Sequence, residues 1–150
     1  MPVPPLELTG LLPAGVHDAT LDEIRLTFGS ENDTRIAIMD GLTKFVAIVR
    51  TFSIFKEFFV DGSFVTQEPA PKDVDVVLLF EANEFGAFAT SPHAKKLVDR
   101  AAFKNEYKVD LLLGPRAVDM PQFFQGLRAE RALELGVATS HRKGILRVTV

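Results

Sequence analysis

Two aspartates, Asp73 and Asp75, open an apolar stretch that is typical of a buried β-strand. Alternate side chains of a strand point to one face, so both carboxylates would project together, with α-carbons about 6.6 Å apart. The opposite face would be apolar and buried, and it consists of Val74, Val76, Leu78 and Phe80. Carboxylates at such a place are costly to bury unless a partner compensates their charge. Since hard divalent cations take oxygen ligands, the pattern indicates a Mg²⁺ site.

Two further features extend this pattern. Asp110 is the one acid in a later apolar stretch, Val109 to Leu113, and it would join the first two acids if that strand lies beside theirs. Gly62-Ser63 follows a short apolar stretch and precedes Asp73 by ten residues, and glycine allows a sharp turn with close approach to a ligand. The Ser63 hydroxyl and nearby backbone N–H groups could hold phosphate oxygens there. Asp61 is interpreted as a turn residue rather than as another acid of the site.

The order and spacing of these residues resemble the DNA polymerase β-like nucleotidyltransferase superfamily. The motif stands here as Gly62-Ser63, Asp73-Val74-Asp75 and Asp110, and the resemblance spans about residues 57–113. More loosely, Leu12-Pro13 to Thr20 followed by Asp61-Gly-Ser-Phe resembles small, stand-alone bacterial members, some of which belong to toxin–antitoxin modules. The resemblance implies a nucleotidyltransferase fold, an α+β domain whose mixed sheet carries helices packed on it.

The resemblance also implies a role for each residue. Asp73, Asp75 and Asp110 would be the catalytic residues and the ligands of two Mg²⁺ or Mn²⁺ ions, and Gly62-Ser63 would grip the triphosphate. The reaction would transfer NMP from an NTP such as ATP to a hydroxyl on RNA or protein, with release of pyrophosphate. The three carboxylates must then meet within range of shared ions, and an arginine salt-bridged in that place would count against transfer.

Several cations could contact the nucleotide, and Lys72, Lys96 and Arg100 are the candidates. Lys96, Arg100 and Lys104 recur every four residues on one expected helix, although a solvated helix face is the simpler interpretation. The basic stretch His141-Arg-Lys143 before the last strand is another candidate, and there too a polar loop without function is the simpler interpretation.

The remaining pattern predicts which elements carry these residues. Thr20 and Glu23 form a capping box that opens a short helix to about Gly29, and a longer helix follows from about residue 32 to 50, with Ile36 on its buried stripe. Strands are expected over residues 57–61, 73–80 and 108–113, and a last, edge strand over 144–150. Helices are expected over residues 91–105 and 121–135.

Length and composition predict one domain over residues 1–150, in which residues 1–17 run extended over the surface and residues 57–113 carry the motif. The chain has no Cys and a net charge of −3, divided into −8 for residues 1–94 and +5 for residues 95–150. This overall acidity weakens the case for a long RNA acceptor. Neither a signal peptide nor a membrane span is apparent, so a cytoplasmic location is expected.

Two other classes of function remain open on the sequence. One is an antitoxin-like or regulatory module that binds a partner protein, which the small size favours. The other is a pseudo-enzyme that binds nucleotide without turnover. The complete set of three acids favours the enzyme.

Overall fold

The computed structural model describes residues 3–92, 94–116 and 119–150, and in these five strands form one mixed sheet in the order β1-β5-β2-β3-β4. β1 pairs with β5 and β3 with β4 in parallel, whereas β2 is antiparallel to both of its neighbours. The strands are β1 Gly15–Asp18, β2 Glu57–Asp61, β3 Val74–Phe80, β4 Val109–Pro115 and β5 Gly144–Thr149. The expected α+β class with a mixed sheet is confirmed.

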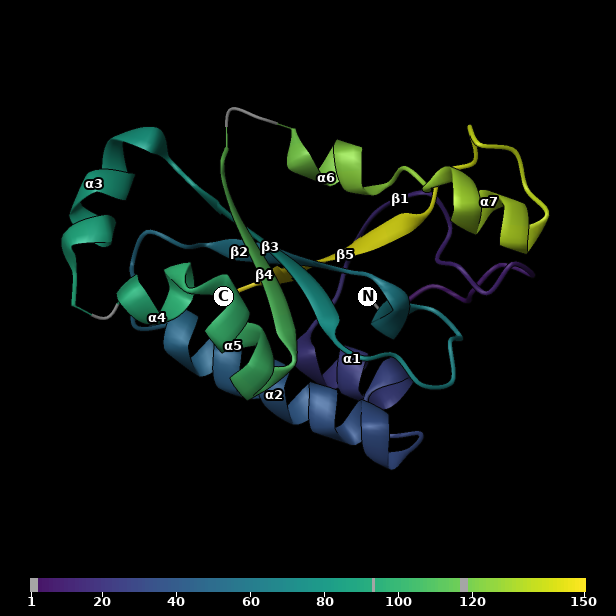
Figure 1. The fold of residues 1–150 in the computed structure, drawn as a ribbon, viewed down its shortest axis with the longest axis horizontal. Helices are drawn as coiled ribbons and strands as arrows, with labels where there is room; N and C mark the ends of the chain where they lie inside the picture. The colour runs from purple at the N-terminus through teal and green to yellow at the C-terminus, as the bar shows by residue number, and fades with distance from the viewer. Residues whose placement is uncertain (1–2, 93, 117–118) are drawn as a thin grey trace.

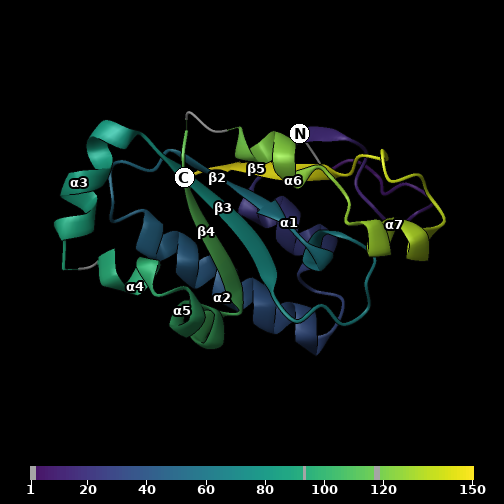
Figure 2. The same cartoon turned by 45° about the horizontal axis from the view of Figure 1, so that its top comes forward.

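Helices cover both faces of this sheet, as Figures 1 and 2 show. On one face lie α1 Leu21–Phe28, α2 Asp33–Val49, α4 Ala94–Val98 and α5 Arg100–Tyr107. On the other lie α6 Met120–Phe124 and α7 Ala129–Leu135. The helix α3 Ala82–Thr90 stands at one end of the sheet, and the short 3₁₀ helix η1 Ser63–Val65 follows β2.

The two faces of the sheet are unequal. The larger core lies on the α2 face, and the sheet contributes to it every second residue of β3, namely Val74, Val76 and Leu78. A small apolar cluster lies on the other face, where Phe59, Val77, Leu79 and Ile145 pack against Met120 and Phe124. Because side chains alternate, Asp75 shares this second face with Val77 and Leu79, so the acids and α6 lie on one side of the sheet.

The N-terminal helices follow the sequence closely. Thr20 and Glu23 form the reciprocal capping box of α1, and the Asn32 side chain caps α2 by accepting from the Arg35 N–H. Most of the expected α2 stripe is buried. Ile36 is the exception, because its side chain is exposed and Ile38 takes the buried place.

Later expectations need correction. The helix predicted over residues 91–105 is two helices separated at Asp99, whose side chain caps α5 by accepting from the Ala102 N–H. The helix predicted over 121–135 is also two, α6 and α7, and α3 was not predicted. The Asp99 cap begins a new helix where the apolar pattern alone runs on. Between α6 and α7 the chain instead leaves the helix at Gly126, which forms a β-bridge with Arg142.

The two ends of the chain also differ from expectation. β5 is not an edge strand, because β1 pairs along its other side. The segment expected to run over the surface therefore supplies a strand, and Leu11 and Leu12 are buried. Such pairing joins distant parts of the chain and leaves no local trace in the sequence. No helix within the described ranges combines the length and apolarity needed to cross a membrane.

Candidate functional site

Three aspartates lie side by side on three neighbouring strands. Asp75 of β3 is paired in register with Asp61 of antiparallel β2 and with Asp110 of parallel β4. Directly paired residues point to the same face of a sheet, so three carboxylates cross it in one row. Asp73, two residues before Asp75, is directed to the same side. The predicted acids thus lie at neighbouring positions on one face of the sheet, and Asp61 joins them although the sequence interpretation made it a turn residue.

Asp75 stands in the middle of this row, and its environment disfavours a negative charge. Burial raises the pKa of its carboxyl to about 6, and the charges of Asp61, Asp73 and Asp110 act in the same direction. The Lys143 ammonium opposes them. Among the described residues, Asp75 forms no salt bridge, so its charge is the one in the row that lacks a direct partner.

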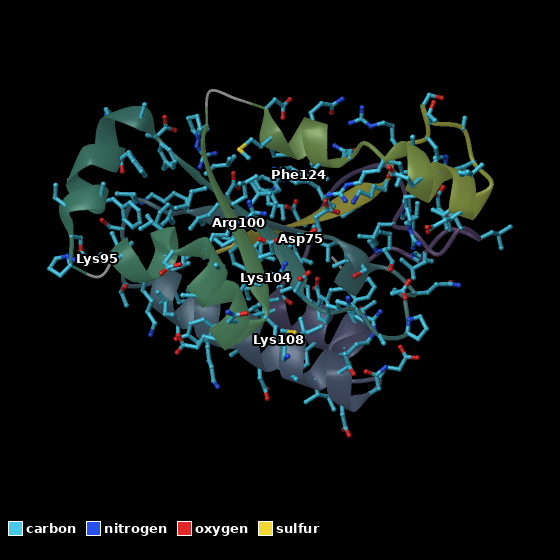
Figure 3. All side chains as sticks on the ribbon, in the orientation of Figure 1. Asp75, Lys95, Arg100, Lys104, Lys108 and Phe124 are labelled. Carbon is cyan, nitrogen blue, oxygen red and sulfur yellow. The ribbon has the colours of Figure 1, made fainter. Side chains whose placement is uncertain are left out.

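Asp110 has the opposite environment because two cations from α5 contact it. Arg100 Nε donates to Asp110 Oδ1 at 2.7 Å, and Lys104 Nζ lies 3.7 Å from Asp110 Oδ2 and 3.2 Å from Asp73 Oδ2. The Arg100 hydrogen bond, together with the charges of Arg100 and Lys104, lowers the pKa of Asp110. Figure 3 shows Arg100 and Lys104 gathered with Asp75 over the middle of the sheet, whereas Lys95 and Lys108 lie apart.

Asp61 has a cation of its own. Lys143 Nζ lies 2.9 and 3.1 Å from the two oxygens of Asp61, and the side chains are only 19% and 3% exposed. This nearly buried ion pair is the feature that the sequence interpretation missed. The signal was present in Asp61 next to Gly62 and in the basic stretch before β5, but nothing in the sequence joins two segments 82 residues apart.

The Gly62-Ser63 turn begins at the carboxyl end of β2. Gly62 has φ 87° and ψ −173°, a conformation that is open almost exclusively to glycine. A β-carbon there would lie 2.7 Å from Asp75 Oδ2, so the absence of a side chain also lets the acid approach. The residues after the turn are held by buried Arg35, which donates to the carbonyl oxygens of Phe64, Thr66 and Glu68.

A cavity of about 710 Å³ opens between this turn and α7. Asp61, Asp75 and Lys143 lie at the sheet end of it, together with Gly62 and Ser63. The wall opposite the sheet is formed by the residues around α6 and α7, namely Phe124, Gly126, Leu127, Arg128, Glu130, Arg131 and Glu134. Figure 3 places Phe124 on the α6 side, above Asp75. A volume of this size accommodates a small organic ligand such as a nucleotide.

Of the three cations predicted to contact the nucleotide, one lies at the acids and two lie elsewhere. Arg100 reaches the acids, but Lys96 does not, since its ammonium lies 5.4 Å from the centroid of the Tyr107 ring. The break at Asp99 separates Lys96 from Arg100 and Lys104, so the three do not form the single helix face expected. Lys72 is exposed immediately before Asp73.

The carboxylate oxygens of Asp73, Asp75 and Asp110 are the kind of ligand that a divalent cation prefers. Negative charges also surround Asp75. The arrangement of these acids differs from the expected one. No three acidic or histidine side chains of the described part of the chain are gathered closely enough to hold an ion. Arg100 and Lys104 contact Asp110 and Asp73 instead, and this is the arrangement that counts against the site as the sequence predicts it.

Known proteins add little on function. A crystal structure of a "putative nucleotidyltransferase" from Sulfolobus solfataricus is similar over 57% of this chain and 73% of that one, at 14% identity and a TM-score of 0.37. No curated protein matches the sequence. Residues 4–149 match the "Family of unknown function (DUF6932)", and the chain belongs to that family.

Proposed function

We propose that this protein is a metal-dependent nucleotidyltransferase that transfers NMP from an NTP, with ATP as the first candidate, to a hydroxyl of RNA or protein. The observation that carries the proposal is the row of paired carboxylates, Asp61, Asp75 and Asp110, which ends at the Gly62 turn. Two of them, Asp61 and Asp75, line a cavity of nucleotide size. Acids are rarely placed side by side in a sheet, because like charges directly opposite destabilise it.

The metal ligands in this proposal are Asp73, Asp75 and Asp110. Bound Mg²⁺ would neutralise charge on the phosphates and on the oxygens that attack and leave. For Asp110 and Asp73 to bind an ion, their contacts with Arg100 and Lys104 must be exchanged. Those cations have side chains that are 57% and 47% exposed, and exposed ion pairs contribute about 1 kcal/mol or less each. The exchange is therefore inexpensive.

The chain's own residues bind and orient the substrate. The triphosphate would lie at the Gly62-Ser63 turn, and the nucleoside would extend along the cavity toward α7. Once released from the acids, Arg100 and Lys104 would be near the phosphates. The acceptor hydroxyl forms a bond to the α-phosphorus while the bond to the bridging oxygen breaks, so that pyrophosphate leaves and the hydroxyl proton passes to water.

A second candidate is a protein that binds nucleotide or a partner protein without turnover. The contacts of Arg100 with Asp110 and of Lys104 with Asp73 favour it, since cations of the chain neutralise two of the three acids without metal. A regulatory or antitoxin-like role belongs to this class.

One experiment distinguishes the two candidates. The purified protein is incubated with α-labelled ATP and Mg²⁺, with and without total RNA or protein acceptors, and the label on the acceptor is measured. Transfer is expected for the wild type and for Asp40→Asn, an exposed aspartate on α2, and it should be absent in Asp75→Asn. ATP binding without transfer in the wild type would establish the second candidate instead.

A further inference from the structure

We propose that Lys143 binds the polyphosphate of the nucleotide in the cavity beside Gly62-Ser63, and that Asp61 is the residue that positions its ammonium. This inference rests on the proposed function but assigns a contact that the motif does not contain. The class of ligand is an inorganic or nucleoside polyphosphate.

The first support is the place of the ammonium. Lys143 and Asp61 both line the cavity, together with Gly62, Ser63 and Asp75. Its ammonium lies 2.9 Å from Asp61 Oδ1, and its charge also acts on Asp75, so it is near two acids of the row. A ligand at the Gly62-Ser63 turn would therefore meet Lys143 at the sheet end of the cavity.

The second support is the unused donor. An ammonium has three N–H donors, and two of the Lys143 donors are directed to the oxygens of Asp61. The third has no acceptor among the residues that the structure describes. Lysine commonly binds phosphate as a point charge, and a charge-assisted hydrogen bond to a phosphate oxygen would satisfy this donor.

The third support is how firmly the lysine is held. Its backbone N–H donates to the Gln125 carbonyl at 2.9 Å, and the next residue, Gly144, donates to the Leu12 carbonyl at 3.0 Å. The Gln125 side chain in turn accepts from the Gly15 N–H at 2.7 Å. Two other segments of the chain, one at Gln125 and one at Leu12, thus hold the backbone around Lys143, and Asp61 holds the end of its side chain. A preorganised cation loses little freedom when it binds a ligand.

The alternative is that Lys143 only neutralises Asp61. The two roles are separated by the single variants Lys143→Met and Asp61→Asn and by the double variant that carries both changes. Removing one partner leaves the nearly buried charge of the other unpaired, whereas the double variant removes both charges of the pair. Urea unfolding and calorimetric titration with inorganic tripolyphosphate and with Mg²⁺–ATP are measured for each. Lys44→Met, an exposed lysine on α2, is the control.

The expected result is that the double variant recovers the unfolding midpoint lost in Lys143→Met but binds tripolyphosphate about tenfold more weakly than the wild type, or worse. Lys44→Met should bind as the wild type does. Wild-type affinity in the double variant would overturn the inference, and so would a wild type that binds neither tripolyphosphate nor ATP.

These outcomes are distinct from those of the transfer assay. Polyphosphate binding that depends on Lys143 in a protein without transfer activity would sink the proposed function and leave this inference standing. Transfer activity in the wild type, together with wild-type tripolyphosphate affinity in the double variant, would support the proposed function and overturn this inference.

Discussion

Asp75 and Asp110 are paired in register on adjacent parallel strands, yet their surroundings shift their pKa values in opposite directions. Burial and neighbouring carboxylates raise the pKa of Asp75 to about 6, whereas the Arg100 hydrogen bond lowers the pKa of Asp110. Carboxyl groups whose environments separate their pKa values are a recurring feature of catalytic sites. The difference arises because burial is the main influence on the central acid of the row, whereas the cations of α5 contact the outer one.

The first prediction concerns Asp75 and pH. A raised folded-state pKa means that the stability contributed by protonated Asp75 is full below about pH 4 and is lost as the pH rises through about 6. Asp75→Asn should therefore be more stable than the wild type at pH 8, by up to about 3 kcal/mol at 1.36 kcal/mol per pKa unit. The two should differ little at pH 4. Urea unfolding at both pH values measures this, with Asp40→Asn as control. An equal difference at the two pH values would contradict the assignment.

The second prediction concerns a divalent cation. Mg²⁺ or Mn²⁺ should raise the unfolding free energy of the wild type at pH 8, by about 2.7 kcal/mol at a hundred times its dissociation constant. The reason is that Asp75 forms no salt bridge within the described residues, while burial and three neighbouring carboxylates disfavour its negative charge. Thermal unfolding with and without the ion tests it. Asp75→Asn should lose most of the stabilisation, and K⁺ at matched ionic strength should give none. Equal stabilisation of the variant would place the ion elsewhere.

The third prediction concerns Arg100. Arg100 forms an ion pair with Asp110 and so competes with a metal ion for that carboxylate. Arg100→Gln should therefore tighten Mn²⁺ binding in the absence of nucleotide. It should lower the unfolding free energy by no more than about 1 kcal/mol. The same change should weaken ATP binding if Arg100 moves to the phosphates. Calorimetry with each ligand separates the two effects. Arg25→Gln removes an exposed arginine that is paired with Asp22 on α1, and it should change neither affinity. Weaker Mn²⁺ binding in Arg100→Gln would show that the arginine supports the metal site.

The fourth prediction compares two glycines. Gly62→Ala forces a residue with a side chain into φ 87° and places a β-carbon 2.7 Å from Asp75 Oδ2, so it should cost about 1–3 kcal/mol and abolish ATP binding. Gly86→Ala is the matched control. Apart from its chain neighbours and the backbone of its own helix, no atom lies within 4 Å of its added β-carbon. Alanine in a helix should stabilise α3 by up to about 1 kcal/mol. Urea unfolding and ATP titration of both variants provide the measurement, and tolerance of Gly62→Ala would exclude a close approach at the turn.

The fifth prediction concerns Arg35, which is 1% exposed. Its guanidinium donates to the Phe28 carbonyl at 3.1 Å as well as to three carbonyls of the segment after Ser63. Lysine lacks the planar fork that reaches all of these oxygens, so Arg35→Lys should cost about 3 kcal/mol. Amide exchange at Val65 and Thr66 should accelerate most. Arg50→Lys, exposed at the other end of α2, is the control. Unchanged exchange in Arg35→Lys would show that the turn holds its shape without the arginine.

What the sequence alone determined is local. Thr20 with Glu23 and Asn32 begin their helices through bonds to backbone groups a few residues away, and the alternation from Asp73 to Phe80 specifies which side of β3 is buried. The motif also identified Asp75 and Asp110, because an acid in an apolar strand stands out wherever that strand lies.

Only the tertiary structure decided what those acids contact. Lys143 reaches Asp61 across 82 residues, β1 pairs beside β5, and the start of α5 at Asp99 turns Arg100 and Lys104 toward the acids while Lys96 lies against Tyr107. Sequence spacing describes the periodicity of single elements. The charge balance of a site depends on which elements pack together, and this is a property of the whole fold.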